Sequence, residues 1–121
     1  MLRNRRLCTP SGRVFTCRVE RKYVPGFQGE SLLYLLLPED GSPRFTILVA
    51  VPGVLMARLG PEFDRLAEAG LPFVEAELEA GASSDLRVEL DPRGGVHRSP
   101  AQGLRKYPMP GADGGEVGSW G

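Results

Sequence analysis

Residues 31–51 decide the fold and read SLLYLLLPEDGSPRFTILVAV. The first part, residues 31–37, is apolar at consecutive positions, as expected for a central strand that is covered on both faces. Residues 38–43 hold two prolines, an aspartate and a glycine, which is the composition of a turn. Residues 44–51 then alternate, with Phe45 and Ile47 on one face. The two apolar segments are therefore predicted to be neighbouring antiparallel strands.

The strand before them is predicted over residues 13–24. Phe15, Cys17 and Val19 share one face of that segment, and polar residues occupy the other face. Such alternation indicates a strand with one buried face. Turn residues at 25–29 connect it to residues 31–37, so three consecutive strands form an antiparallel meander.

A helix is predicted after the meander. Pro61 suits the first helical position, and Glu62 and Asp64 suit the first turn because the helix dipole favours negative charge there. Gly70 is expected to cap this helix, and Pro72 to prevent its continuation. Residues 54–59 are expected to add one short helical turn before it.

Two features of residues 73–79 point in opposite directions. Val74, Ala76 and Leu78 alternate with glutamates, which favours a strand, whereas the abundance of alanine, glutamate and leucine favours a helix. We predict a strand, because a helix would spread the glutamates over more than one face. Residues 86–90 alternate cleanly and are predicted to be the last strand.

The predicted fold is therefore α+β. It is an antiparallel meander sheet of about five strands, with a partial barrel as an alternative closure, and one helix lies between the third and fourth strands. Residues 1–12 form a basic N-terminal arm or a short edge strand, with 3–8 as the strand, and residues 13–91 form the domain. Residues 92–121 contain eight glycines and four prolines and are predicted to be an extended C-terminal arm.

Charge is unevenly distributed along the 121 residues, although the net charge is zero. Residues 1–30 hold seven basic and two acidic residues, whereas residues 31–91 hold four basic and eleven acidic ones. The basic Met1–Arg6 stretch is not followed by the apolar region of a signal peptide, and residues 32–37 are too short to span a bilayer. The expected location is the cytoplasm or a particle assembled there, without a membrane partner.

Few residues suggest chemistry. His97, the one histidine, lies in a loop with no carboxylate positioned beside it by the local sequence. Cys8 and Cys17 lack the nearby histidines of a metal site and are expected to be small packing residues. The acidic residues of 75–79 and 89–91 are expected to form a solvated sheet face rather than a cation site. No catalytic residue, metal or cofactor is therefore predicted.

The favoured function is that of a non-enzymatic structural subunit that binds other protein subunits, of the same or a different chain. A component of a phage particle or of another multisubunit bacterial machine would have this character. Large apolar side chains spaced along the C-terminal arm are typical of segments that dock in grooves on a partner. The predicted contact residues are Leu104, Tyr107, Met109 and Trp120 of that arm, with Arg3, Arg5 and Arg6 as electrostatic contacts. The protein is expected to belong to an oligomer or a larger complex.

The alternative is a small nucleic-acid-binding or regulatory protein that uses the basic N-terminal surface. Phosphate binding needs several cations on one surface, and an exposed aromatic residue can stack on a base. The candidate residues are Arg13, Arg18, Arg21, Lys22 and Tyr23. The acidic middle of the chain would repel phosphate, which makes this alternative the weaker one.

Overall fold

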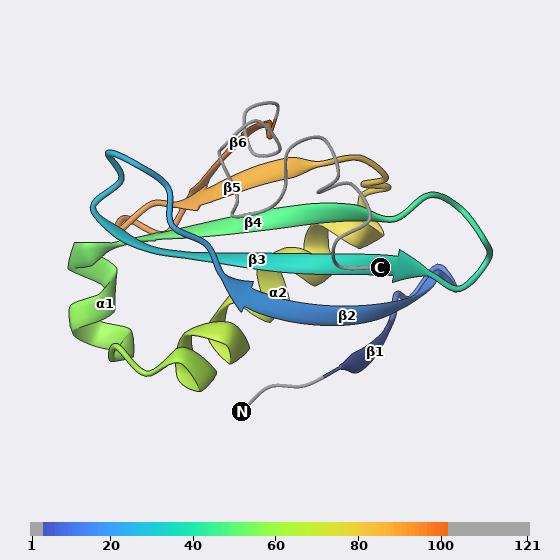
Figure 1. Ribbon diagram of the computed structural model, residues 1–121, viewed down its shortest axis with the longest axis horizontal. Coiled ribbons are helices and arrows are strands. Elements are labelled where there is room, and N and C mark those ends of the chain that lie inside the picture. The colour runs from blue at the N-terminus through green and yellow to red at the C-terminus, as the bar shows by residue number, and fades with distance from the viewer. Residues whose placement is uncertain (1–3, 102–121) are drawn as a thin grey trace, which may run out of the picture.

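A computed structural model of the protein describes residues 4–101. They form one sheet with helices packed against one of its faces (Figure 1). In chain order the elements are β1 Arg5–Cys8, β2 Val14–Arg21, β3 Gly29–Pro38, β4 Phe45–Pro52, α1 Gly53–Leu59, α2 Phe63–Glu79, β5 Leu86–Leu90 and β6 Val96–Pro100. The α+β prediction is confirmed.

The sheet is mixed rather than wholly antiparallel. Its strand order follows the chain from β1 to β6, and each neighbouring pair is antiparallel except β4 and β5, which are parallel. A parallel pair needs a crossover connection, and α1 and α2 supply it. The predicted meander is therefore correct for β2, β3 and β4, whereas the prediction of a wholly antiparallel sheet with one helix is wrong.

The prediction of a strand at residues 73–79 is also wrong, because α2 continues to Glu79. Leu71, Val74 and Leu78 are buried at helical spacing, whereas Ala76 is exposed. Burial of that stripe against the sheet outweighs the strand-like alternation. The glutamates are correspondingly separated, since Glu77 is buried while its neighbours Glu75 and Glu79 are exposed.

Gly70 lies inside α2 for a packing reason rather than as a cap. The buried Tyr34 hydroxyl reaches under the helix and donates a 2.7 Å hydrogen bond to the Ala67 carbonyl. A Cβ atom at position 70 would overlap that hydroxyl. Pro72 also lies within α2, so the helix contains a residue that cannot donate a backbone hydrogen bond to the preceding turn.

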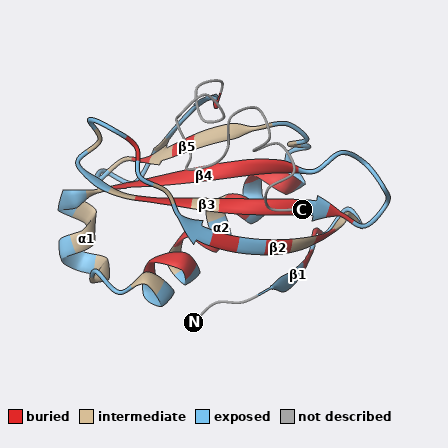
Figure 2. Ribbon diagram, viewed as in Figure 1, coloured by how far each residue is buried: buried red, intermediate tan, exposed pale blue. Residues whose placement is uncertain are grey.

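One face of the sheet packs against the helices and is called the helix face. Its core consists of alternate residues of the strands together with the apolar side of α2. Fully buried members from three strands are Phe15, Tyr34 and Ile47, and α2 contributes Leu66 and Val74. The buried positions are concentrated in β3, β4 and α2 (Figure 2).

Residues 96–100, which the sequence assigned to the C-terminal arm, form β6 and pair with β5. Arg98 of β6 donates to Glu77 of α2, so this strand is joined to the helix as well as to the sheet. Among residues 4–101, β1 and β6 each have one strand neighbour, so the sheet is open in this part of the chain. Neither described helix is long and apolar enough to cross a membrane.

Candidate protein-binding surface

The face of the sheet opposite the helices has an apolar centre. The strand register places on it alternate residues of β3 and β4, here called the outer stripe: Leu33, Leu35, Leu37, Leu48 and Ala50. Leu33 lies directly opposite Leu48, and Leu35 lies opposite Thr46. Because side chains alternate between faces along a strand, the apolar run at residues 31–37 supplies both the helix face and this stripe.

Charged residues border the outer stripe on both sides. On β2, Arg18 and Glu20 lie opposite Leu35 and Leu33 and are joined by a 3.3 Å ion pair. On β5, Arg87 and Glu89 lie beside the β4 part of the stripe and are joined by a 3.1 Å ion pair. An apolar centre with a polar rim is the usual composition of a protein interface.

A small second core covers one part of the stripe. Val24 and Ala101 pack with Leu48, and the partly buried Phe27 joins them. The Arg87 guanidinium lies 5.3 Å from the centre of the Phe27 ring, which holds the loop after β2 against β5. The last described residue of the chain is therefore seated on this face.

Leu35 differs from Leu48 in the side chains that pack against it. Its side chain is 2% exposed, yet it belongs to neither of the two core clusters formed by residues 4–101. Leu37, further along the same strand, is 47% exposed. The outer stripe was not predicted as a surface from the sequence. The signal was available, because residues 31–37 are apolar on both faces of the sheet while the helices follow β4 and cover one face.

The basic N-terminal residues that fall in the described part of the chain are paired. Arg5 contacts Glu68 of α2 at 3.1 Å, and Arg6 contacts Glu39 at 3.0 Å. The hydrogen bond and the charge of Glu39 raise the pKa of the Arg6 guanidinium. All four side chains are substantially exposed, and such pairs typically contribute about 0–1 kcal/mol. Arg3 lies outside the described residues.

The candidate nucleic-acid residues do not share one surface. Arg13 donates to the Leu78 and Ala82 carbonyls at 2.7 and 3.0 Å and lies over the Phe15 ring, so it closes the C-terminal end of α2. Arg21 lies over Phe63 on the helix face.

The remaining three candidates are Arg18, Lys22 and Tyr23. Arg18 is on the outer face in its ion pair with Glu20. Partial burial lowers the pKa of Lys22. Tyr23 is 81% exposed. The structure thus places Arg18 on the face opposite Arg21, and Arg13 at the C-terminal end of α2.

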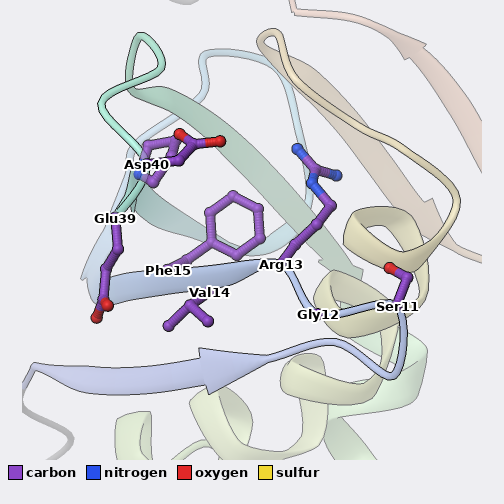
Figure 3. A pocket seen from close by; sticks show the side chains of 8 residues that line it. Ser11, Gly12, Arg13, Val14, Phe15, Glu39 and Asp40 are labelled. Atoms are coloured by element: carbon purple, nitrogen blue, oxygen red, sulfur yellow. The ribbon is translucent and has the colours of Figure 1, made fainter.

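A shallow cavity of about 380 Å³ lies between the β1–β2 turn and the β3–β4 turn (Figure 3). Its lining residues are Ser11, Gly12, Arg13, Val14, Phe15, Pro38, Glu39 and Asp40. The polar groups are used to hold local structure. Ser11 donates to Glu79 at 3.1 Å, Glu39 pairs with Arg6, and hydrogen bonds from Ser42 lower the pKa of Asp40. Neither histidine nor cysteine lines the cavity.

His97 does have a carboxylate neighbour, contrary to the local sequence pattern. Its Nε2 lies 3.3 Å from Asp91 at the β5–β6 turn, on the exposed edge of the sheet. A backbone hydrogen bond from Arg93, followed by the contact with His97, lowers the pKa of Asp91. Among residues 4–101, no three metal-ligating side chains cluster. Cys8 is exposed and Cys17 is buried, and both are free thiols.

Comparisons with protein-family models, curated proteins and solved structures found no match for this chain. The predicted contact residues Leu104, Tyr107, Met109 and Trp120 lie outside the described residues.

Proposed function

We propose that the protein is a small non-enzymatic assembly subunit that binds neighbouring protein subunits through its terminal arms. The observation that carries this proposal is the outer stripe, which is apolar, bordered by charge, and packed at one end by Ala101, the last described residue of the predicted C-terminal arm. Leu37 is its exposed member, and an apolar face bordered by charge has the composition that suits an apolar protein segment.

The composition of the arm complements that face. Leu104, Tyr107, Met109 and Trp120 are large side chains that bury considerable area, and glycine and proline separate them. A segment of this kind can lie extended across the strands and place successive apolar side chains against the stripe. The neighbouring Arg18, Glu20, Arg87 and Glu89 would pair with polar groups of the arm and set its direction.

The basic N-terminus provides the second proposed contact. Arg5 and Arg6 are held by exposed carboxylates of their own domain. Exposed ion pairs are weak, so these two arginines can exchange their partners for carboxylates of a neighbouring subunit at little cost. Arg3 adds charge to the same end of the chain. We place this assembly in the cytoplasm or in a particle formed there.

The test is deletion of residues 104–121. Native mass is measured by light scattering, and folding is measured by circular dichroism and urea unfolding. We expect the deletion to abolish assembly while the domain stays folded. A matched control deletes residues 111–119, which retains Leu104, Tyr107, Met109 and Trp120 and should retain assembly. Full assembly by the protein lacking residues 104–121 would overturn the proposal.

The nucleic-acid alternative has less support, because Arg13 and Arg21 face away from Arg18. Phosphate contacts make affinity fall steeply with added salt. A fluorescently labelled oligonucleotide titrated at low salt tests this alternative. Binding that weakens steeply with salt, and that is lost on Arg18→Gln, would revive it at the expense of the assembly role.

A further inference from the structure

We infer that the outer stripe is the seat of the C-terminal arm, and that in the isolated subunit it holds the arm of the same molecule. The segment concerned is residues 102–109, with Leu104, Tyr107 and Met109 as the docked side chains. This inference rests on the proposed role of the arm and adds where the arm binds and what a neighbour must displace. Assembly then proceeds by exchange of the arm between molecules.

The first observation is the position of Ala101. It is 6% exposed and packs with Leu48 and Val24, so the chain is already on the outer face when it leaves the described region. Leu104 follows three residues later, and three extended residues span about 10 Å. Leu35 lies two residues from Leu33 along β3, and Leu33 lies opposite Leu48. The first apolar side chain of the arm is therefore within reach of the Leu35 part of the stripe.

The second observation is the burial of Leu35. The helices pack on the opposite face, and the loop cluster of Val24 and Phe27 packs with Leu48 and Leu33. Leu35 is nevertheless 2% exposed without belonging to either cluster. Leu35 lies between Arg18 and Thr46 in the strand register, so it extends the apolar part of this face beyond the second core, on the side where the proposed arm would lie.

The proposed arm is tethered beside the outer stripe through Ala101. A segment attached at the border of its own binding surface has an effective concentration of roughly millimolar. A second copy in dilute solution competes at its much lower bulk concentration. The arm of the same molecule therefore occupies the stripe until subunits are concentrated, and the same contacts can then form between molecules, as in domain swapping.

The test measures the accessibility of the stripe in the full chain. A cysteine is introduced by Leu35→Cys in a Cys8→Ser background, which removes the exposed native thiol. The remaining native thiol, Cys17, is buried and has a pKa raised to about 12, so it reacts slowly at neutral pH. The rate of thiol alkylation is compared between the native arm and an arm carrying Leu104→Asp, Tyr107→Asp and Met109→Asp.

We expect alkylation at position 35 to be at least about tenfold slower with the native arm, which corresponds to about 1.4 kcal/mol of docking free energy. Tyr23→Cys in the same background is the control, because Tyr23 is 81% exposed and its rate should not depend on the arm. Equal rates at position 35 with both arms would overturn the inference.

A second measurement leaves the stripe unaltered. A photoreactive benzophenone side chain replaces Tyr107, and cross-linked peptides are mapped at micromolar protein concentration. Links to residues 31–37 or 46–50 within one chain support the inference. Links to those residues only between two chains would show that the arm docks on a second copy, and links elsewhere would show a different seat. Each of the last two results overturns the inference. The proposed assembly role is tested separately, by the deletion of residues 104–121.

Discussion

The two faces of the sheet are made by the same strands but are covered very differently. On the helix face, α2 buries a continuous stripe against β2, β3, β4 and β5. On the outer face, the described cover is limited to Val24, Phe27 and Ala101 around Leu48. β3 and β4 are apolar on both faces. The comparison teaches that the two helices stabilise one face, whereas the proposed interaction uses the other.

The largest expected effect is on the helix face. Leu66→Ala removes a fully buried side chain of α2 and leaves a cavity, so we expect the free energy of unfolding to fall by about 2–5 kcal/mol. Urea unfolding followed by circular dichroism measures this loss. A loss below about 1 kcal/mol would mean that the helix face is not the stabilising one.

Alkaline pH should also act through the helix face. Burial raises the pKa of the Cys17 thiol to about 12 from a value near 9, and burial raises the pKa of Tyr34 as well. The folded state then keeps protons that the unfolded state loses, so the contribution of these two groups to stability is constant below pH 9 and falls as pH rises towards 12. For Cys17 alone the slope is about 1.4 kcal/mol per pH unit in that window.

Urea unfolding between pH 7 and 11 measures that slope. Cys17→Ala lowers stability at every pH through lost packing, but it should make the alkaline slope shallower. An unchanged slope in Cys17→Ala would contradict the assigned cause.

The next effect is at the contact between Tyr34 and α2. Gly70→Ala should destabilise the protein by about 1–3 kcal/mol through overpacking, although alanine is the better helix former. The cost should be smaller in a Tyr34→Phe background, since the hydroxyl is the nearest atom. A double-mutant cycle by urea unfolding measures the coupling. Additive effects would show that the hydroxyl does not require the glycine.

The smallest effect on stability is expected on the outer face. Leu37 is 47% exposed, so Leu37→Ser should change the free energy of unfolding by only about 0.5 kcal/mol. The same substitution places a polar group in the outer stripe and should weaken assembly measured by light scattering. A large loss of stability without any change in assembly would reverse the roles of the two faces.

The strands were the most predictable part of the fold. β5 lies at residues 86–90 as its alternation predicts, and β3 and β4 differ from their predicted bounds by one or two residues. Their patterns follow directly from which side chains alternate and where turn residues interrupt them. Residues 3–8 were predicted as an optional edge strand, and β1 occupies residues 5–8 of that range.

The errors come from interactions distant in sequence. Gly70 and Pro72 resemble the end of a helix, and only the Tyr34 hydroxyl from β3 shows why a glycine stands inside one. β6 is polar and flanked by glycine and proline, so its pairing with β5 left little local signal. Similarly, the ion pairs of Arg5 with Glu68 and of Arg6 with Glu39 join residues that are distant in sequence and meet only in the folded protein.

The agreement between strand order and chain order has a consequence for how the molecule forms. From β1 to β4 each strand joins the one made immediately before it, through short turns that close quickly. The pairing of β4 with β5 must instead wait for the intervening 53–85 segment to be gathered, which costs more chain entropy. Pulse-labelled hydrogen exchange should therefore show β2, β3 and β4 protected before β5. The pairing of β6 with β5, and with it the packing of Ala101 against Leu48, then comes last, as the final step of folding.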